Sequence, residues 1–573
     1  MAGKFSPGSK VAASAALILA LHLSATWSCS QTFEERLDRY IHSFPRHEEF
    51  HGVVFAAAGE RVFVNKGYGL ANREFNIPNG PDSRFQIGSI SKAFTAILVL
   101  KMVQAGRLRL DGTISDYLPY YPEDAGGKIT IHHLLSHTSG IRHHHVAVPD
   151  YWLRHDKVFH TPRELVSLFS PLPRAHEPGE RITYSSPGFY VLGAILEQAA
   201  KKSYAELLRE YILDPLGMKD TSVENNRTVR GMTTTGYMRG LGGLVRAGFE
   251  DKSTALAAGD LVSTARDLYL WDAGIRKGKV LSPEYLEILY KLIVPDDVFT
   301  YGGPLLSIPY ENGRKTLRLN RLTGSSTGYS AAMDRLLGPD ACVVVLSNVQ
   351  DADTTRMLDD ISDFLTRYEL GLPVGNPAPP TVAPPPAVKV DRAEIEKVLG
   401  FYRGPGGAIS GAVRGGGGVF LLGISGGSVI PPVLELVPEG PGIFHLGFRP
   451  EFMCRFSPGE TDGRLVLTTS RGERILSTAK RIEPDKIDAS AYEGFYSSVE
   501  LQKTFRFSRN ESGLVAEKFL GDADVRMIPL EKDLFGCELG FLNFSRYPDG
   551  SISGFKLMTY NVDAYFGSRF TRI

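Results

Sequence analysis

The sequence contains few cysteines, four in 573 residues. Cys29 lies near the N-terminus, and the other three, Cys342, Cys454 and Cys537, lie far apart. An odd number of scattered cysteines does not make a disulfide framework, and their spacing is not that of a metal site. We therefore expect stability to come from hydrophobic cores, which a chain of this length can build, and we expect neither a metal nor another cofactor.

The sequence also lacks net charge, because 64 lysines and arginines balance 64 aspartates and glutamates. A chain without a basic excess has no overall attraction to nucleic acid or to anionic membranes. We therefore expect a small-molecule or short-peptide substrate and no nucleic-acid partner.

The N-terminal segment lacks the roughly 20 consecutive apolar residues that a membrane helix needs. Two lysines precede an apolar stretch, residues 11–23, and small and polar residues follow it. This order predicts a secretory signal peptide over residues 1–30, and hence a secreted or periplasmic protein. Two kinds of processing remain open. The first is ordinary cleavage near residues 25–30. The second is a lipid anchor at Cys29, which would make the protein a lipoprotein, although the residues before Cys29 resemble a lipoprotein cleavage box only loosely.

Prolines concentrate in residues 374–390, which read VGNPAPPTVAPPPAVKV. Prolines at this density exclude helix and ladder pairing and favour an extended linker. A first domain over residues 31–373 precedes the linker, and strand and helix patterns mix in it. Residues 52–69 predict a hairpin, and a buried strand at 341–349 precedes an amphipathic helix at 354–370.

The region after the linker loses the helical period, and short alternating runs are separated by turn residues. This pattern of short alternating runs and turns predicts an all-β structure. The region also contains an internal repeat, because the motif LGFYRG around Gly400 is similar to YEGFYSS around Gly494. A second pair of similar motifs follows in the same order in the two halves of the region. The repeat predicts one small barrel over residues 391–482 and a second over residues 483–573.

A candidate nucleophile lies in the stretch FQIGSISKAFTAILVL. Residues 93–103 are nearly all apolar and predict a buried helix, with Ser89 and Lys92 on one face of its first turn. The N-terminus of a helix favours a developing alkoxide, and a sheltered lysine gives up its proton more readily and can then take that of the serine. The alternative is an N-cap serine beside a solvated lysine. Spacing alone does not decide, since STAK at Ser477 has the same spacing inside an alternating strand, where nothing shelters the lysine.

Further sequence motifs lie on both sides of Ser89. In order they are PDSRFQIGSISKAFTA, LRLDGTISDYLPYYP, ITIHHLLSHTSGI, YILDPLGMKDTS and LVSTARDLYLW. Together they resemble the serine β-lactamase-like family over about residues 40–370. More narrowly they resemble its class C branch, which includes class C β-lactamases, D-alanyl-D-alanine carboxypeptidases, D-aminopeptidases and esterases.

The resemblance implies an α/β fold in which an antiparallel sheet is sandwiched by helices and carries an all-helical insert. It also implies that Ser89 forms an acyl-enzyme that water then hydrolyses. The two repeats after the linker resemble the eight-stranded, lipocalin-like barrels that follow the catalytic unit in D-aminopeptidases.

The second element of the family, Tyr-x-Asn, matches Tyr184-Ser185-Ser186. The resemblance makes Tyr184 a general base or proton shuttle for Ser89, because a phenol flanked by cations ionises more readily. Ser186 stands where the family has asparagine, and it has no amide to bridge the acylamino group of a substrate. Because Ser186 precedes Pro187 and an apolar helical run, an N-cap is the alternative to a role in substrate binding.

The third element, Lys or His, a small residue and Gly, matches Leu322-Thr323-Gly324. By resemblance, Gly324 lets a substrate lie along the strand, and the N–H of Ser325 joins that of Ser89 as an oxyanion hole. The cation is missing at Leu322. Arg321 is adjacent, but neighbours along a strand face opposite sides. Recognition of a carboxylate, and with it typical β-lactamase or carboxypeptidase activity, is therefore not expected.

The histidines could suggest a metal site. They are His132, His133, His137 and His143 to His145. Most lie in or near the family word ITIHHLLSHTSGI, and no acidic residues accompany them at ligand spacing, so we interpret them as surface and packing residues.

Two functions remain open. The first is a secreted serine hydrolase with Ser89 as nucleophile and Lys92 and Tyr184 as base and acid, acting as an esterase or as a D-aminopeptidase-type amidase or peptidase rather than as a true β-lactamase. The second is a non-catalytic relative of penicillin-binding proteins that binds cell-wall peptides, because two of the three family elements are altered.

Overall fold

In the computed structural model, the described residues are 32–43, 50–143, 155–369 and 390–572, apart from short breaks. In the first domain these breaks are 241–242, 294–299, 304, 311–314, 338–339 and 351. After the linker they are 405–408, 416–417, 426–427, 447–448, 460–463, 472–473, 483–487, 499–502, 511–512, 521–522, 538–539 and 560–568. The predicted signal peptide with Cys29, and residues 374–389 of the predicted linker, lie outside the described residues.

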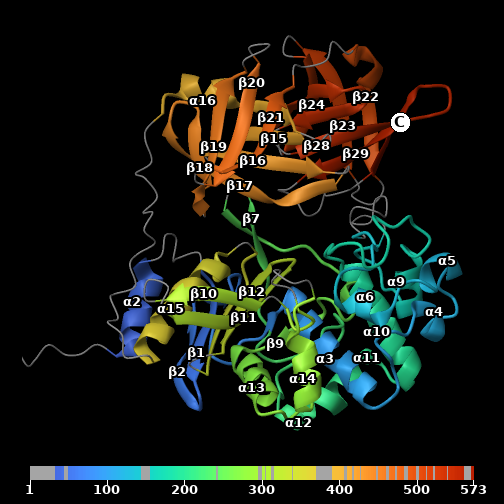
Figure 1. The fold of residues 1–573 in the computed structure, drawn as a ribbon. Coiled ribbons are helices and arrows are strands. Elements are labelled where there is room, and N and C mark those ends of the chain that lie inside the picture. The colour runs from blue at the N-terminus through green and yellow to red at the C-terminus, as the bar shows by residue number, and fades with distance from the viewer. Residues whose placement is uncertain are drawn as a thin grey trace, which may run out of the picture.

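An antiparallel sheet of six strands forms the centre of the first domain, in the order β10-β11-β12-β13-β1-β2 (Figure 1). Its strands are β10 (Leu305–Tyr310), β11 (Lys315–Ser326), β12 (Tyr329–Leu336), β13 (Ala341–Ser347), β1 (Gly52–Ala58) and β2 (Arg61–Tyr68). The hairpin predicted over residues 52–69 is β1 and β2, and the strand predicted over 341–349 is β13. Both β1 and β13 are buried at every position, which requires cover on both faces of the sheet.

Helices cover both faces of this sheet. On one face lie α2 (Phe33–Ser43) and α15 (Thr354–Glu369), the amphipathic helix predicted at 354–370. Their apolar side chains share a core with the alternate residues Val54, Val343 and Val345 of the sheet. On the other face lie α3 (Ser91–Gln104), α13 (Ala265–Arg276) and α14 (Pro283–Tyr290), which belong to a larger core with Val53, Phe55 and Val344. The period of two along a strand sends successive side chains into these two cores.

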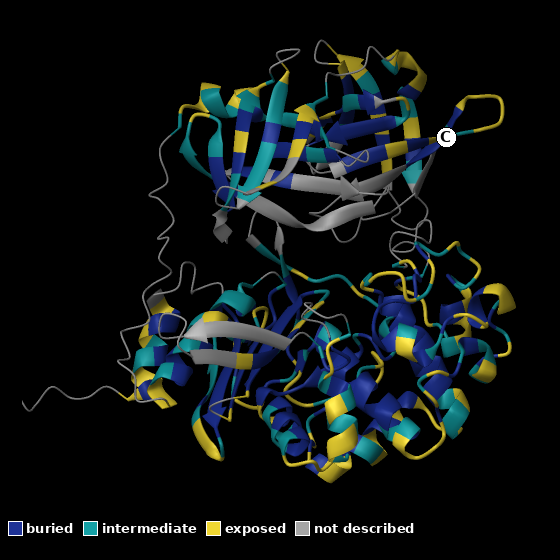
Figure 2. Cartoon of the chain, viewed as in Figure 1, coloured by how far each residue is buried: buried dark blue, intermediate teal, exposed yellow. Residues whose placement is uncertain are grey.

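A mainly helical segment lies beside α3 and carries the rest of the larger core (Figures 1 and 2). Its helices are α4 (Ile114–Tyr117), α5 (Glu123–Gly126), α6 (Ile131–Leu135), α9 (Pro162–Ser167), α10 (Ser186–Ala200), α11 (Tyr204–Leu208) and α12 (Asp214–Leu216), with a π-helical turn at Arg209–Leu213. The helix α10 is buried from Ser186 to Leu196 and contacts α3, α6 and α9. An α/β unit with an antiparallel sheet between helices is therefore present, as the family resemblance implies.

Short strands connect these parts. They are β3 (Leu70–Asn72) with β4 (Ile77–Pro78), β5 (Phe85–Gln86) with β9 (Leu261–Ser263) and β6 (Ser222–Val223), and β7 (Tyr237–Gly240) with β8 (Gly243–Arg246). The β7–β8 ribbon reaches toward the region after the linker, where β7 contacts β17 (Figure 1). Over the described residues, no helix has the length and apolar character needed to cross a membrane.

The first repeat after the linker is a closed barrel of eight antiparallel strands, preceded by the helix α16 (Arg392–Val398). Its strands are β14 (Gly400–Arg403), β15 (Ile409–Gly415), β16 (Gly418–Ser425), β17 (Ser428–Gly440), β18 (Ile443–Leu446), β19 (Arg449–Pro458), β20 (Leu465–Arg471) and β21 (Arg474–Arg481). The ladder closes where β14 pairs with β21. STAK at Ser477 lies in β21, so it belongs to a strand as its alternation predicts.

The second repeat is a nine-stranded sheet rather than a second ladder-closed barrel. Its strands are β22 (Gly494–Ser498), β23 (Lys503–Asn510), β24 (Gly513–Leu520), β25 (Ala523–Arg526), β26 (Ile528–Glu531), β27 (Leu534–Cys537), β28 (Gly540–Arg546), β29 (Ile552–Thr559) and β30 (Arg569–Arg572). The ladder stays open between β25 and β26, which are separated only by the buried Met527. One intervening residue cannot turn a strand back on itself, so β25 pairs with β24 and β26 continues onward to pair with β27.

The two repeated words occupy equivalent places in the two repeats. Gly400 and Gly494 each open a first strand, with φ of 147° and 144°. Two residues later, the hydroxyl of Tyr402 donates to the Val398 carbonyl, and that of Tyr496 donates to the Tyr492 carbonyl, in each case four residues back. The sequence repeat therefore reflects a repeated way of starting the sheet.

Candidate active site

Ser89 lies in a single 3-10 turn, Gly88–Ile90, that runs directly into α3. The sequence pattern placed it inside the first turn of the helix, and the structure places it just before that turn. Gly88 makes this entry with φ of +48°, a conformation that glycine adopts without steric cost. The helix is buried from Ser91 to Leu100, because its apolar residues occupy all sides and it is surrounded by the larger core.

Two polar groups converge on the hydroxyl oxygen of Ser89. The ammonium of Lys92, one turn further along, donates to Ser89 Oγ at 3.1 Å, and the phenol of Tyr184 donates to the same atom at 2.8 Å. The Lys92 Nζ also lies 5.0 Å from the centre of the Tyr184 ring. The structure therefore brings together the three residues for which the sequence predicts the chemistry.

Lys92 is only 7% exposed, and a turn of the chain holds its end in place. Its Nζ donates to the Ala258 carbonyl at 2.8 Å. The same turn accepts a hydrogen bond from Thr95 at the Ala257 carbonyl, and its Leu261 N–H donates to Ser91 Oγ. Three polar side chains near the start of α3, those of Ser91, Lys92 and Thr95, thus fix the turn that receives the lysine.

A buried carboxyl group braces this turn from behind. Asp260 is 2% exposed, and its Oδ2 accepts the N–H of Ala257 at 3.0 Å. Burial raises the pKa of Asp260 from 3.8 to about 7. No sequence pattern marked this residue.

Tyr184 is 43% exposed and lies two residues before the start of α10. The expectation that Ser186 caps this helix is wrong by one residue. Ser185 is the cap, because its backbone is extended with φ of −139° and its Oγ accepts the N–H of Gly188 at 3.2 Å. Ser186 is the first helical residue, is 9% exposed and does not line the pocket described below, so the structure does not bring it to the site.

The strand β11 passes in contact with the Ser89 turn at two glycines. A methyl group on Gly324 would lie 1.9 Å from the Ile87 carbonyl oxygen and 3.0 Å from the Ser89 nitrogen. A methyl group on Gly88 would lie 2.7 Å from the Ser325 nitrogen. Gly324 is therefore needed for the approach of the Ser89 turn, a different role from the substrate contact predicted for it. The contact places the N–H groups of Ser89 and Ser325 in neighbouring backbone segments, as an oxyanion hole requires.

Leu322 and Thr323 lie on opposite faces of β11. Thr323 is exposed, whereas Leu322 is 5% exposed and lies against Gly303. Arg321 faces away from the site, as strand alternation predicts, and forms ion pairs with Asp334 and Asp359 at 2.6 Å. It does not supply the cation missing at Leu322.

A pocket of about 500 Å³ opens above Ser89. The described residues that line it all lie between positions 89 and 355, and Lys92 is the only lysine or arginine among them; none is an aspartate or glutamate. They are Ser89, Lys92, Ala93, Leu135, His137, Tyr184, Phe189, Thr300, Tyr301, Gly303, Leu322, Thr323, Gly324, Ser325, Ser330, Ala331, Ala352, Thr354 and Thr355. We did not identify Leu135, Thr300, Tyr301, Thr354 and Thr355 from the sequence, because they come from separate parts of the chain and no shared motif marks them.

A second buried network ties the Ser89 turn to β11 from below. Lys252 donates to Ser326 Oγ at 2.9 Å and to Glu250 at 2.7 Å, and Ser326 Oγ donates to the side chain of Gln86 at 2.8 Å. Because Gln86 precedes the Ser89 turn and Ser326 ends β11, this chain of contacts connects both sides of the predicted oxyanion hole.

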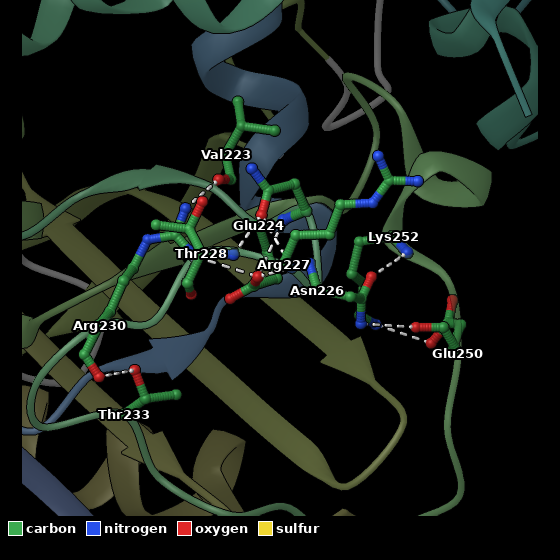
Figure 3. Close-up of polar contacts among 10 residues, drawn as sticks. Val223, Glu224, Asn226, Arg227, Thr228, Arg230, Thr233, Glu250 and Lys252 are labelled. Atoms are coloured by element: carbon green, nitrogen blue, oxygen red, sulfur yellow. Dashed lines mark hydrogen bonds and ion pairs between the residues drawn. The ribbon is translucent and has the colours of Figure 1, made fainter. Parts of the chain in front are cut away.

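The loop from Val223 to Thr233 holds Lys252 and Glu250 in place, as Figure 3 shows. The amide of Asn226 donates to the Glu250 carbonyl at 3.0 Å, and its oxygen accepts the N–H of Lys252 at 2.7 Å. An ion pair between Arg230 and Glu224, 3.1 Å apart, closes the loop on itself. These contacts give the network a fixed geometry.

The histidines of the family word fall into different roles. His132 bonds to the hydroxyl of Tyr301 through Nδ1, and His133 caps α6 by accepting the N–H of Thr130. His137 is buried and lines the pocket, so it is a packing residue beside the candidate site. His144 and His145 lie outside the described residues. Within the described ranges, no three histidines, cysteines or acidic residues gather as metal ligands would.

Comparison with known proteins places this geometry among related chains. A family model described as Beta-lactamase matches residues 37–367, more than half of the chain. The chain is 28% identical over 313 residues to a putative penicillin-binding protein, PbpX, of Bacillus subtilis, a match that covers 54% of this chain and 74% of that protein. It is 31% identical over 183 residues to Protein flp of Staphylococcus aureus, where only 31% of this chain and 35% of that protein are covered.

One solved structure extends beyond the first domain. The octameric penicillin-binding protein homologue from Pyrococcus abyssi covers 78% of this chain and 100% of its own, with a TM-score of 0.51 and 24% identity. At that identity the likeness concerns the fold alone.

Proposed function

The chain belongs to the beta-lactamase family of serine hydrolases, and on that premise we propose that it hydrolyses an ester or amide through an acyl-enzyme on Ser89. The observation that carries the proposal is the convergence of the Lys92 ammonium and the Tyr184 phenol on Ser89 Oγ, at 3.1 and 2.8 Å. A serine that only capped a helix would not need two proton-exchanging groups on its oxygen.

The proposed reaction has two halves. The hydroxyl proton of Ser89 moves to Lys92 or Tyr184, whichever is deprotonated, while Oγ attacks the substrate carbonyl carbon. The carbonyl oxygen becomes an oxyanion held by the N–H groups of Ser89 and Ser325. The leaving alcohol or amine takes the proton, and an acyl-enzyme remains. Water then gives up a proton to the same base and attacks the ester carbon, which releases the acid and restores the Ser89 hydroxyl.

We propose an uncharged acyl group as the substrate's binding portion. Besides Lys92, the described pocket lining contains no cation to pair with a carboxylate, and Leu322 occupies the position of the family's Lys or His. Leu135, Tyr301 and Leu322 offer apolar surface in its place. An ester is therefore the first candidate, and a D-aminopeptidase-type amide or peptide is the second.

We further propose that the protein acts outside the cytoplasm. The proposal rests on the signal-peptide pattern of residues 1–30, with ordinary cleavage or lipidation at Cys29 as its two routes. The intact mass of protein purified from its native host would distinguish cleaved, lipidated and uncleaved forms, and an uncleaved N-terminus would contradict secretion.

The test of the activity uses the full mature chain with p-nitrophenyl acetate and a fluorophosphonate probe. Ser89→Ala should abolish labelling and turnover, whereas Ser477→Ala, the matched control from the strand STAK, should leave both unchanged. A panel of short esters, D-amino-acid amides and nitrocefin then ranks substrates, with esters expected first and nitrocefin last. If the wild type neither turns over nor becomes labelled, the non-catalytic, peptide-binding alternative replaces this proposal.

A further inference from the structure

His137 occupies a strained place directly behind the candidate site. It follows α6, and its backbone adopts φ of +57°, which is uncommon for a residue other than glycine. Its side chain is buried, with 8% exposure, and it lines the pocket. A backbone held in an unfavourable conformation beside a site is a reason to ask what the side chain does there.

The residue holds the chain on both sides of Tyr184. The N–H of Thr183 donates to the His137 carbonyl at 2.8 Å. The N–H of Ser185 donates to the imidazole Nδ1 of His137 at 3.2 Å. The two neighbours of Tyr184 are therefore anchored to one residue, which fixes the backbone from which the phenol projects.

The imidazole ring also supports the phenol ring. The rings of His137 and Tyr184 are stacked, with centroids 4.6 Å apart and an angle of 29° between their planes. Phe189 packs near the imidazole, with its centroid 5.1 Å away. The tyrosine, although half exposed on its other side, thus rests on a buried aromatic surface.

The imidazole of His137 is neutral at this position, and its Nδ1 can accept the Ser185 N–H only in the neutral form. Burial lowers the pKa of His137 to about 3, and the charge of nearby Lys92 adds to the effect. A neutral imidazole can accept a hydrogen bond at Nδ1, whereas a protonated one cannot. The Ser185 contact is therefore available across the pH range in which the enzyme would work.

We propose that His137 is a positioning residue that holds the Tyr184 phenol on Ser89 Oγ, by accepting the Ser185 N–H and by supporting the phenol ring. The inference rests on the proposed function, since it assigns His137 a part in the reaction of that same site. A reacting group displaced by about 1 Å can lose about 100-fold in rate, so a residue that fixes the phenol affects turnover through the position of that phenol.

Two substitutions distinguish the loss of the hydrogen-bond acceptor at His137 from an effect of the backbone strain at this position. Asn and Gly both tolerate positive φ, but only Asn offers an oxygen at the position of Nδ1. His137→Gly should lower kcat on p-nitrophenyl acetate by about 100-fold with little change in KM, and His137→Asn should recover at least about tenfold of that loss. Crystal structures should show the Tyr184 to Ser89 oxygen distance lengthened beyond 2.8 Å in the glycine variant and largely restored in the asparagine variant.

A matched control lies elsewhere in the same domain. His51 is also buried, its pKa is lowered to about 4 by burial, and its Nδ1 accepts the N–H of Leu70 at 2.7 Å, but it does not line the pocket. His51→Asn and His51→Gly should therefore change the melting temperature without the kcat pattern of His137.

Three results would overturn the inference. They are wild-type kcat in His137→Gly, equal losses of kcat in the glycine and asparagine variants, or an unmoved Tyr184 in the crystal of the glycine variant. If wild-type protein hydrolyses no ester at all, the proposed function fails, while the crystallographic distance still tests whether His137 positions Tyr184.

Discussion

The phenol oxygen of Tyr184 lies 2.8 Å from the hydroxyl oxygen of Ser89, although 95 residues separate the two in the chain. The contact exists because α10, which follows Tyr184, packs against α3, which follows Ser89, within one hydrophobic core. Both residues stand at the N-terminal ends of these buried helices, so packing of the helices brings the two polar groups together.

Removing the Tyr184 hydroxyl should therefore impair proton transfer more than binding. We expect Tyr184→Phe to lower kcat on p-nitrophenyl acetate by about 100-fold to 10,000-fold, the usual contribution of a positioned acid or base, with KM changed little. Steady-state kinetics measures it. Tyr120→Phe is the control, because that ring lies over Arg163 and outside the Ser89 pocket, and it should behave as wild type. Equal kinetics in both variants would leave Lys92 as the only base.

The close approach at Gly324 makes a second prediction. A methyl group there would overlap the Ile87 carbonyl oxygen at 1.9 Å, so β11 and the Ser89 turn must separate in Gly324→Ala. We expect about 100-fold or more loss of kcat, as for removal of an oxyanion-hole donor. Gly231→Ala, with nothing within 4 Å of the added methyl, should keep full activity. Wild-type turnover in Gly324→Ala would show that the predicted oxyanion hole is not used.

These contacts also show which parts of the site could be predicted from sequence. Ser89, Lys92 and Tyr184 lie in words with fixed spacing next to apolar helices, and the structure brings these residues together. The cap position was misplaced from Ser185 to Ser186, because two adjacent serines before Pro187 are equivalent in the sequence and only the backbone angle separates them.

Other parts of the site leave no local signal. Tyr301 contacts His132, which lies far from it in the chain, whereas Asp260 accepts a hydrogen bond from Ala257 within its own turn, and neither belongs to a periodic pattern or motif. His137 lies in a recognised word, but its support of Tyr184 depends on a positive φ and on ring stacking, which sequence spacing does not encode.

The fold likewise contains elements that could be predicted from the sequence and a feature that could not. The sequence pattern predicted β1, β2, β13 and α15 within a residue or two, because β1 and β13 are buried at every position, β2 is the second strand of the hairpin that β1 begins, and α15 buries one face. The open ladder of the second repeat was not predicted, because local sequence does not determine that β25 pairs with β24 while β26, one residue further on, pairs with β27.

The identity of residue 322 should set the choice of substrate. Leu322→Lys places an ammonium at a position that lines the pocket together with Leu135 and Tyr301, where a substrate carboxylate could pair with it. A hydrogen bond to a charged group contributes about 1.5–3 kcal/mol, so the rate on nitrocefin relative to p-nitrophenyl acetate should rise by about tenfold or more. Leu322→Met, of similar length without charge, should leave this ratio unchanged. A ratio that responds equally to both variants would contradict the account of the missing cation.

The buried carboxyl of Asp260 should make stability depend on pH. Burial raises its pKa from 3.8 to about 7, so between these values the folded protein keeps a proton that the unfolded chain releases. Stability from this group is complete below about pH 4 and falls, by up to about 1.4 kcal/mol per pH unit, as pH rises to about 7. Asp260→Asn mimics the protonated acid and should flatten this fall.

Urea unfolding at pH 5 and pH 8 measures the effect of Asp260→Asn. Of the three tryptophans, Trp152 and Trp271 lie in the first domain and Trp27 lies in the predicted signal peptide, so the fluorescence of the mature chain reports on the first domain. The exposed Asp82→Asn is the control and should keep the pH dependence of the wild type. A slope unchanged in Asp260→Asn would show that the carboxyl is ionised in the folded protein.

The proposed role of Ser89 is tested most directly by locating the acyl group on the protein during turnover. The mature chain is mixed with an excess of p-nitrophenyl ester, quenched in acid within the first turnovers, digested and mapped by mass spectrometry. We expect one acyl group on the peptide that contains Ser89, and none in Ser89→Ala. An acyl group attached to a different residue, or one that persists in Ser89→Ala, would contradict the proposed role of Ser89.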